Sequence, residues 1–568
     1  MSHLFGCIKP SDDLGGHKLP ENIGTLLIDT PTFQLYTSGA SKNTFFNIDE
    51  NSESGYVAVG VGLRKENDIV KHLDQNDWDN ILLKTGFDTS ILDGHFLVVR
   101  WDEEKVELKN DFLGLRTAYL YTDQEQITYF STRLDWLSNV IKKPEIDLST
   151  FGAHWVLINQ INNECFLKQV KRLGPSAHAI SKNGTITIEE ELFSPSFEIS
   201  SIEDFNNELE AYSNPQSDFN LNVGLSGGLD SRAILSAVSS TQDVEAYSFG
   251  SKANPDVYIA EHVARESRVT HLFYEETIPL FKDSERDILN YIGQLQGVSP
   301  VHGFYRENVL RDINSRNNLM IDGGFGEIHR RQFLGRLAFM NSKKPAEVSV
   351  EELFNSLTES KFNFFEKSVS DQMIEGSKSQ VLTVWEKAIS NSDSNLENCI
   401  DLFSLYSRVS NTSAMDHSWS DSLIPAYMPF VQKGMLKVMF GLPIEKRING
   451  RLFRGFIRKH NSTLSKLPLV KSGLTYPFSF GKYTSTAFTR MKKKFVNPYH
   501  DTFGRKFLLE NKDYVMDLML SKKVRECELY EYNTIKETIE GFYKGNYGLE
   551  ISVTQWLGFE LWRNTTGF

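Results

Sequence analysis

The run Leu221-Asn222-Val223-Gly224-Leu225, followed by Ser226-Gly227-Gly228-Leu229-Asp230-Ser231, decides how the rest of this sequence is interpreted. Its first five residues form an apolar run of the length typical of a buried strand, and Arg232-Ala233-Ile234-Leu235 opens a helical pattern. Between them, a Gly-Gly pair lets the backbone turn tightly, so that successive N–H groups point into one concavity at a helix N-terminus. Such a concavity binds phosphate.

The polar side chains of the loop suit pyrophosphate. Ser226 and Ser231 supply hydroxyl donors at its two ends, and Asp230 places a carboxylate where it can hold Mg²⁺ between phosphate oxygens. The loop is neither GxxxxGK[ST], because it has no lysine, nor the dinucleotide loop GxGxxG. The alternative is a capped strand-to-helix turn without a ligand. The elements predicted on either side favour the phosphate loop.

Two more strands are expected in step with the first, at residues 244–249 and 271–274, with a helix over 256–265 between them. The order β-α-β-α-β is typical of a parallel, nucleotide-binding sheet. Beyond Glu276 the sequence is mainly helical in pattern. The second half of the chain therefore predicts an α/β domain with many helices.

The N-terminal part has a different pattern, because short β-rich runs alternate with turn signals over the first roughly 190 residues. The runs at 24–28, 56–61, 96–101 and 127–130 are examples, and they predict a strand-rich α+β domain. Residues 194–220 are polar, rich in Ser, Glu and Asn, and are interpreted as a linker. We therefore expect two domains, at residues 1–195 and 205–568.

Composition excludes several classes of protein. With 40% hydrophobic and 24% charged residues, the chain is neither disordered nor fibrous. A net charge of −13 gives no electrostatic reason to bind nucleic acid, and Lys492-Lys493-Lys494 is interpreted as a solvated helix face. No stretch approaches the roughly 20 apolar residues of a membrane span, and the N-terminus does not resemble a signal peptide.

Four cysteines lie far apart in the sequence, without CxxC spacing: Cys7, Cys165, Cys399 and Cys527. This pattern fits neither a disulfide framework nor a zinc site, and it favours a reducing compartment. We expect a cytoplasmic protein.

Leu225-Ser226-Gly227-Gly228-Leu229-Asp230-Ser231 resembles the pyrophosphate loop of the asparagine synthetase superfamily, which also contains the β-lactam synthetases and the lasso-peptide cyclases. The segment from Leu557 to Trp562 is similar to the closing helix of that family. The resemblance implies an N-terminal nucleophile (Ntn) hydrolase-like α+β domain, followed by an adenine-nucleotide alpha-hydrolase-like (PP-loop) domain. It also implies an ATP- and Mg²⁺-dependent ligase that adenylates a carboxylate, transfers it to an amine and releases AMP and pyrophosphate.

The resemblance assigns residues to the nucleotide. It implies that backbone sites at Leu225 and Phe249 bind adenine. It also implies that the phosphates are bound by the loop residues Ser226, Gly227, Gly228, Asp230 and Ser231. Asn254-Pro255-Asp256 looks like the start of the helix that follows the second strand in the family.

A second element, Ile321-Asp322-Gly323-Gly324-Phe325-Gly326-Glu327, resembles the acidic Gly-rich turn of the family with departures. The usual magnesium-binding aspartate falls on Gly326, which leaves Glu327 or Asp322 as the second metal carboxylate beside Asp230. A family base position falls on Gly323, which cannot act as a base and is kept as a nucleotide-binding position. The alternative is a tight turn with incidental acids.

Two later segments complete the resemblance. Residues 424–431 look like the Pro-Phe segment of the family but lack its preceding glutamate and arginine. Lys471-Ser472-Gly473 is similar to the lysine-glycine loop, whose lysine supports the transition state, so Lys471 joins Asp230 and Glu327 as the catalytic set. Four arginines are candidates for phosphate or carboxylate contacts, with solvated helix faces as the alternative: Arg330, Arg331, Arg454 and Arg458.

The N-terminal domain departs from glutamine-using relatives. Their chemistry needs a cysteine directly after the removed methionine, because the free α-amine is the base for the thiol. Here position 2 is Ser2, and Phe5-Gly6-Cys7-Ile8 places Phe5 at the nucleophile position. Cys7 is interpreted as a small buried strand residue, unless processing removes six residues before it. Because Asp93-Gly94-His95-Phe96 and Asp111-Phe112-Leu113-Gly114 resemble structural strands of that domain, we expect a retained fold without glutaminase activity.

The leading hypothesis is thus a ligase that uses an amine other than glutamine-derived ammonia. One alternative is a glutamine-dependent asparagine synthetase, and another is a catalytically silent nucleotide-binding or scaffold relative. The carboxylate and amine substrates stay open, as peptide or small molecule and as intramolecular cyclisation or intermolecular amidation. A homodimer or a biosynthetic partner protein is also left open.

Overall fold

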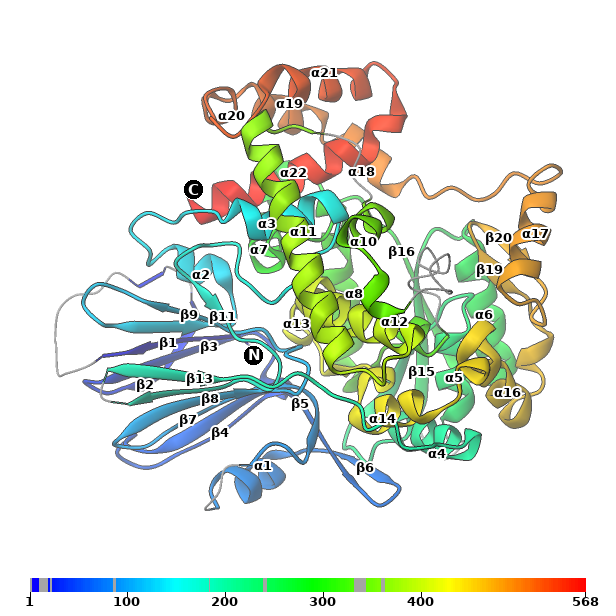
Figure 1. Ribbon diagram of the computed structural model, residues 1–568, viewed down its shortest axis with the longest axis horizontal. Helices are drawn as coiled ribbons and strands as arrows, with labels where there is room; N and C mark the ends of the chain where they lie inside the picture. The colour runs from blue at the N-terminus through cyan, green and yellow to red at the C-terminus, as the bar shows by residue number, and fades with distance from the viewer. Residues whose placement is uncertain are drawn as a thin grey trace.

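The computed structural model describes residues 3–9, 19–20, 23–84, 88–182, 184–238, 243–330, 344–358 and 363–568. Ser2 and Arg331 lie outside this part. A strand-rich N-terminal region stands beside a larger helix-rich region, with the C-terminal helices above both in Figure 1. The α/β fold class with an α+β N-terminal part is therefore confirmed.

The N-terminal region contains two mainly antiparallel sheets. The first has the order β11-β9-β10-β1-β3-β2: β1 (His3–Ile8), β2 (Thr25–Asp29), β3 (Phe33–Ser38), β9 (Tyr119–Thr122), β10 (Thr128–Ser131) and β11 (Lys171–Arg172). The second has the order β13-β12-β8-β7-β5-β4, with β6 on β5: β4 (Thr44–Ile48), β5 (Gly55–Glu66), β6 (Ile69–His72), β7 (Leu92–Trp101), β8 (Lys105–Asn110), β12 (His178–Lys182) and β13 (Thr185–Glu189).

These two sheets pack face to face. Phe33 and Leu35 of β3 share one buried cluster with Val57, Val59 and Leu97 of the second sheet. Alternate residues of each strand thus build a core between the layers. Three helices accompany them: α1 (Gln75–Leu82), α2 (Leu134–Ser138) and α3 (Leu148–Leu157). The two packed sheets agree with the strand-rich α+β domain that the sequence predicted.

The second region is built on a five-stranded parallel sheet with the order β16-β15-β14-β17-β18. Its elements are β14 (Asn220–Gly224), α5 (Asp230–Ala237), β15 (Val244–Gly250), α6 (Pro255–Ser267), β16 (Thr270–Glu275), β17 (Asn318–Ile321) and β18 (Ala426–Tyr427). The predicted β-α-β-α-β order is confirmed. Strands β17 and β18, which were not predicted, extend the sheet on the other side of β14.

Strand order reverses at β14, because the chain builds β15 and β16 on one side of it and then returns to place β17 on the other. Ligands of open parallel sheets bind in the crevice outside the carboxyl ends of the strands at such a switch point. The loop after β14 lies at this position. Leu319 and Ile321 pack on one face of the sheet and Met320 on the other, so both faces are covered.

One expectation about the connection was wrong. Residues 202–213 of the predicted linker form α4 (Ile202–Ser213), which begins with a capping box between Ser201 and Asp204. Its Phe205, Leu209 and Tyr212 are buried in the same cluster as the parallel sheet. Their spacing of four and three residues marks an amphipathic helix, and the polar residues between them gave the segment its linker-like composition.

The remaining helices form the bulk of the second region. The longer ones are α7 (Phe281–Leu295), α8 (Arg306–Ser315), α10 (Val350–Leu357), α11 (Lys367–Ser390), α12 (Leu396–Ser404), α13 (Ala414–Asp421), α14 (Lys433–Gly441), α16 (Arg451–His460), α17 (Lys482–Lys492), α18 (Phe503–Glu510), α19 (Lys512–Leu520), α21 (Tyr532–Tyr543) and α22 (Glu550–Thr566). In the described part of the chain, no helix is long and apolar enough to cross a membrane.

The two regions are closely packed against each other. Glycines let α3 and α11 approach, since a Cβ on Gly152 would lie 2.4 Å from the Met373 carbonyl oxygen and one on Gly376 2.3 Å from that of Ser149. The final helix α22 joins this contact, with the Phe559 ring centroid 4.8 Å from that of Phe151. The N-terminal sheets are therefore anchored to the helical region.

Candidate functional site

The loop between β14 and α5 is held by its own side chains. The N–H of Ser226 donates to Ser231 Oγ at 3.2 Å, and the N–H of Gly228 donates to Ser226 Oγ at 3.2 Å. The N–H of Gly227 donates to Asp256 Oδ1 at 3.0 Å. Three successive backbone N–H groups of the loop are thus each bound to a different side-chain oxygen, which is the kind of atom that pyrophosphate would present to them.

Gly227 is required at its position by close packing. A Cβ there would lie 2.4 Å from Val470 Cγ2 and 2.9 Å from Asp256 Oδ1. Val470 belongs to β19 (Leu469–Lys471), which pairs with β20 (Leu474–Tyr476) in a hairpin, and its N–H donates to the carbonyl of Gly227 at 3.2 Å. The hairpin that carries Lys471 is therefore docked directly on the loop.

A cavity of about 510 Å³ opens over the loop at the switch point. Eight of the predicted nucleotide and metal residues line it: Leu225, Ser226, Gly228, Asp230, Ser231, Phe249, Asp322 and Gly323. They come from the ends of β14, β15 and β17, which adjoin in the sheet. The structure thus brings most of the predicted site together around one space.

Asp230 supplies the carboxyl group of this loop, and its surroundings shift its pKa. Burial raises its pKa to about 6, with the neighbouring charge of Glu327 adding to the rise and that of Arg330 opposing it. Arg330 donates to Oδ2 at 2.5 Å. Within the described part of the chain, Oδ1 is buried and accepts no hydrogen bond. A buried carboxylate oxygen without a donor suits a cation.

The acidic turn after β17 is shaped around Asp230. A Cβ on Gly326 would lie 2.4 Å from Asp230 Cγ, so an aspartate cannot occupy this position in the present geometry. Glu327 is half-buried and lies close enough to act on the pKa of Asp230. Asp322 is exposed, and its Oδ1 accepts from the N–H of Gly324 at 2.9 Å.

The three predicted metal carboxylates are not gathered at one point. Among the described residues, no group of three or more His, Cys, Asp or Glu side chains is arranged to hold a metal ion. The charge of Glu327 acts on both Asp230 and Asp322, while Oδ1 of Asp322 is occupied by the N–H of Gly324. Mg²⁺ commonly uses only one or two carboxylates together with substrate phosphates, and the free oxygen of Asp230 fits that mode.

The two predicted adenine positions differ in what they offer. The N–H of Leu225 donates to the Tyr247 carbonyl at 2.7 Å, as part of the sheet. The side chain of Phe249 is 38% exposed and contacts Tyr305, with ring centroids 5.9 Å apart. Phe249 therefore supplies an open aromatic surface at the cavity wall.

Lys471 is near the loop through its backbone, but its ammonium points elsewhere. Its Nζ donates to Thr486 Oγ1 of α17 at 2.7 Å, and Lys471 does not line the cavity. Burial lowers its pKa, and the charges of Lys482 and Arg490 lower it further. The hairpin turn uses left-handed backbone at Ser472 and Gly473, with φ values of 49° and 70°.

The candidate arginines are separated by the fold. Arg330 pairs with Asp230, whereas Arg454 donates to the backbone carbonyls of Phe478 and Phe480 and is buried. Arg458 is exposed on α16, away from the loop cavity. Only Arg330 of the described three is thus part of the site.

Sequence reasoning missed an ion pair in the cavity wall. Arg306 at the start of α8 donates to Asp416 Oδ1 of α13 at 2.6 Å, and both residues line the cavity. They are separated by more than a hundred residues, and no local pattern links them. Asn254 caps α6, whereas Asp256 accepts the N–H of Gly227 and so holds the loop.

The N-terminal candidate lies in a packed core. Phe5 and Cys7 of β1 are fully buried within one hydrophobic cluster. Burial raises the pKa of the Cys7 thiol to about 11, which keeps it protonated. The interpretation of Cys7 as a small buried strand residue is confirmed.

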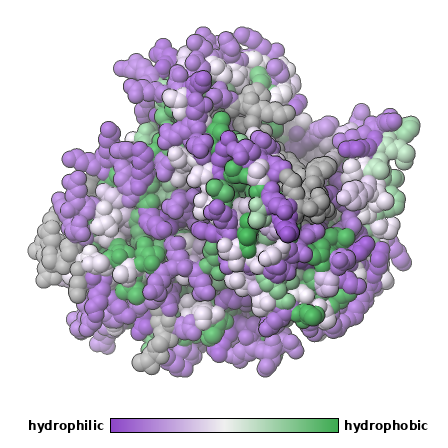
Figure 2. All heavy atoms as spheres, in the orientation of Figure 1, coloured by the Kyte–Doolittle hydropathy of each residue, from purple (hydrophilic) through white to green (hydrophobic). Residues whose placement is uncertain are grey.

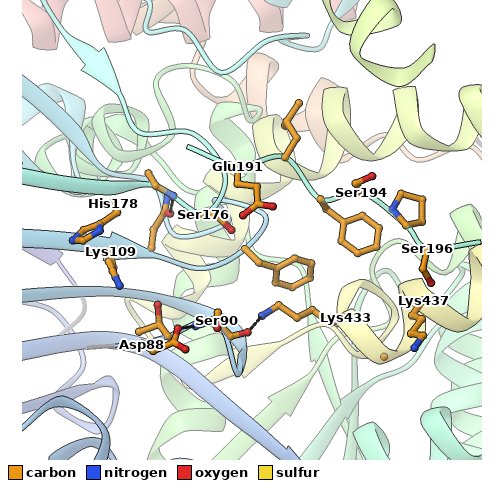
Figure 3. A pocket seen from close by; sticks show the side chains of 18 of the residues that line it. Asp88, Ser90, Lys109, Ser176, His178, Glu191, Ser194, Ser196, Lys433 and Lys437 are labelled. Carbon is orange, nitrogen blue, oxygen red and sulfur yellow. Dashed lines mark hydrogen bonds between the residues drawn. The ribbon is translucent and has the colours of Figure 1, made fainter. Parts of the chain in front are cut away.

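A larger cavity, of about 650 Å³, lies between the second sheet and α14 (Figure 3). None of the predicted site residues that the structure describes lines it. Lys433 donates to the carbonyls of Ser90 and Leu92 at 2.6 and 2.7 Å, and Lys437 pairs with Glu198 at 3.0 Å. Because these cations already serve the packing of α14, the smaller cavity over the loop is the stronger candidate site.

A family model described as "Asparagine synthase" matches residues 213–290 of the chain. The matched segment contains β14, the loop, α5, β15, α6 and β16. The loop geometry and this match agree with a nucleotide-binding α/β segment similar to that of asparagine synthase. The resemblance of the loop to the asparagine synthetase superfamily is therefore supported for this segment of the chain.

Solved structures give only remote likenesses. The "allosteric regulatory enzyme of purine biosynthesis" has a TM-score of 0.21 at 10% identity, covering 66% of this chain and 86% of that one. Glutamine phosphoribosylpyrophosphate amidotransferase from B. subtilis, with ADP and GMP, has 0.22 at 10%, covering 66% and 87%. Glutamine-dependent NAD+ synthetase from Acinetobacter baumannii, with ADP, has 0.17 at 13%, covering 63% and 69%. No curated protein matches the chain.

Proposed function

We propose that this protein activates a substrate carboxylate as an acyl-adenylate and transfers it to an amine, releasing AMP and pyrophosphate. The observation that carries the proposal is the loop at the switch point, where three successive backbone N–H groups bind oxygen acceptors and a buried oxygen of Asp230 accepts no hydrogen bond from the described residues. A loop that holds the β- and γ-phosphates leaves the α-phosphate open to attack by a carboxylate.

In this proposal Asp230 would hold Mg²⁺, with Glu327 or Asp322 as the second carboxylate. The ion would neutralise charge that develops on the phosphates. Ser226, Gly227, Gly228 and Ser231 would bind pyrophosphate oxygens through the donors that the loop now satisfies internally.

Adenine would lie against the exposed ring of Phe249, near the backbone of Leu225 and with Gly323 close to the phosphates. A Cβ on Gly323 would approach the N–H of Ser231 to 3.1 Å, so a glycine keeps this side of the loop open. The cavity volume of about 510 Å³ is in the range of ordinary ligand sites.

Lys471 is proposed to stabilise the negative charge of the second step. Its hairpin contacts the loop through Val470, which supports this role. Its ammonium must leave Thr486 to reach the adenylate, so we propose that a side-chain movement accompanies substrate binding.

The amine is proposed to belong to the substrate itself. The buried Cys7 thiol, with its raised pKa, lacks the neighbouring free amine that glutamine hydrolysis requires. We also propose that residues 1–195 form an amidotransferase-like domain without glutaminase activity and residues 205–568 the ligase domain. Proteolytic cleavage of the chain between residues 195 and 205 should yield a C-terminal fragment that still binds the nucleotide.

Exchange of radioactive pyrophosphate into ATP, dependent on a carboxylate, tests the reaction. A screen of amino acids, sugar acids and peptides should yield at least one carboxylate that supports exchange and AMP formation. Formation of ADP with that substrate would contradict the adenylate mechanism.

A catalytically silent nucleotide-binding relative is a second candidate, favoured by the Arg330–Asp230 ion pair and by Gly326 in place of an acid. In a silent relative the guanidinium would serve in place of the metal. ATP affinity that is the same with and without Mg²⁺, together with no exchange for any carboxylate, would favour this candidate.

A further inference from the structure

The positive charge of this protein is concentrated in one stretch. Between Lys446 and His500 there are thirteen Lys and Arg residues and no Asp or Glu, although the whole chain has 74 acidic and 61 basic residues. We call residues 446–500 the basic segment. Because the whole chain has a net charge of −13, the rest of it carries −26.

The fold places most of these charges on the surface. The basic segment forms α16, the β19–β20 hairpin and α17, at the right of Figure 1. Its exposed cations are Lys446, Arg451, Arg458, Lys459, Lys466, Arg490, Lys493 and Lys494. Of these, Lys459 pairs with Glu203 of α4. A field of one sign attracts partners of the opposite sign and raises their association rate.

A cavity of about 470 Å³ lies within the basic segment. Three cations and three aromatic side chains are in its wall: Arg458, Lys466, Lys492, Tyr476, Phe478 and Phe488. In the described part of the chain, no carboxylate lines it. A site of cations over aromatic faces suits a carboxylate on a short apolar stem.

Lys492 is fixed by hydrogen bonds, and Arg458 lies over a ring of the cavity wall. Lys492 Nζ donates to the carbonyl and to Oγ1 of Thr475, both at 2.9 Å, which ties α17 to the hairpin. The Arg458 guanidinium lies 5.6 Å from the ring centroid of Phe478. The cavity is therefore preformed, because its walls are held by contacts inside the basic segment.

Apolar side chains stand beside the cations on α17 and just after it. Tyr483 is 75% exposed, Met491 56%, Phe495 83% and Val496 46%. Figure 2 shows hydrophobic and hydrophilic side chains together on this projection. Exposed aromatic and apolar residues grouped within a charged surface are typical of protein–protein interfaces.

We propose that the basic segment binds an acidic polypeptide, with one carboxylate side chain in the cavity between α16 and α17 and apolar side chains against Tyr483 and Phe495. Charge complementarity requires a negatively charged partner. The exposed apolar residues favour a polypeptide, which offers apolar side chains, over a polyanion that offers charge alone. The partner binds beside the hairpin of Lys471, outside the loop cavity.

Binding of a fluorescein-labelled peptide that alternates Glu with Phe and Leu tests the proposal by fluorescence anisotropy, on the full chain. We expect R458Q/K466Q to weaken binding by about tenfold or more, since both cations face the cavity. Y483S/F495S should weaken it by a smaller factor. The control K522Q/K523Q removes two exposed lysines of α20 (Lys522–Arg525) and should bind as the unaltered chain does.

Thermal unfolding of each variant separates lost binding from lost folding. The proposal is overturned if the peptide does not bind the unaltered chain, or if R458Q/K466Q binds it as tightly as the control. It is also overturned if single-stranded DNA or phosphatidylserine vesicles bind the segment more tightly than the peptide. Pyrophosphate exchange is measured separately, so failure of the ligase mechanism does not decide this outcome.

Discussion

Asp230 and Cys7 both have a raised pKa, but their surroundings differ. Burial raises the pKa of both groups, to about 6 for Asp230 and about 11 for Cys7. Asp230 lines a cavity and has an oxygen that accepts no hydrogen bond within the described part of the chain, whereas Cys7 is enclosed by a hydrophobic cluster. A perturbed pKa indicates a reactive site only where a substrate can reach the group.

The largest expected effect is that of Asp230→Asn. The substitution removes the carboxylate that we assign to the metal, and we expect turnover to fall by at least about a hundredfold. Carboxylate-dependent ATP–pyrophosphate exchange measures the loss. Asp256→Asn is a matched control, because it keeps an oxygen for the N–H of Gly227 and should have a smaller effect. Near-normal exchange in Asp230→Asn would remove this residue from the site.

Lys471→Ala should separate the two half-reactions. We expect overall amide formation to fall by about a hundredfold, since the ammonium no longer stabilises negative charge in the second step. Pyrophosphate exchange should be partly spared. Lys482→Ala is the comparison, as Lys482 is a nearby cation of α17 that lowers the pKa of Lys471. An equal loss of exchange and amide formation in Lys471→Ala would place the lysine in the first step instead.

The pH dependence should report the carboxyl of Asp230. Its pKa is raised to about 6, so the carboxylate form is lost as the pH falls through that value. We therefore expect kcat/KM for ATP to fall over the same pH range, which forms the acidic limb of the pH profile. Arg330→Gln removes the guanidinium that opposes the rise, and the limb should therefore move to higher pH. If the acidic limb of the pH profile lies at the same pH in Arg330→Gln as in the unaltered chain, a group other than Asp230 is titrating.

The smallest effect is expected for Cys7→Ala. Synthesis should be essentially unchanged, and the free energy of unfolding should fall by about 1–2 kcal/mol because a buried sulfur is removed from a packed core. Glutamate release from glutamine should be absent in both forms. Intact-mass measurement supplies the check on processing, since a chain that begins at Cys7 would regain a thiol beside a free amine. Cys7-dependent glutamine hydrolysis would replace our assignment with a glutamine-dependent asparagine synthetase.

The sequence by itself determined the local elements of the site. The apolar run before the loop, the Gly-Gly pair and the two later strands predicted β14, α5, β15 and β16, because strand and helix periodicity and glycine turns are properties of short segments. The same reasoning failed at α4, whose apolar positions were hidden among polar residues. It also gave no sign of β18, which has only two residues.

Only the tertiary structure decided which side chains meet. The ion pairs Arg330–Asp230 and Arg306–Asp416 join residues about a hundred positions apart, and the contact of Gly326 with Asp230 depends on how β17 lies beside β14. The direction of the Lys471 ammonium toward Thr486 likewise follows from the docking of α17. Such contacts arise from the packing of distant segments, and local sequence patterns do not encode them.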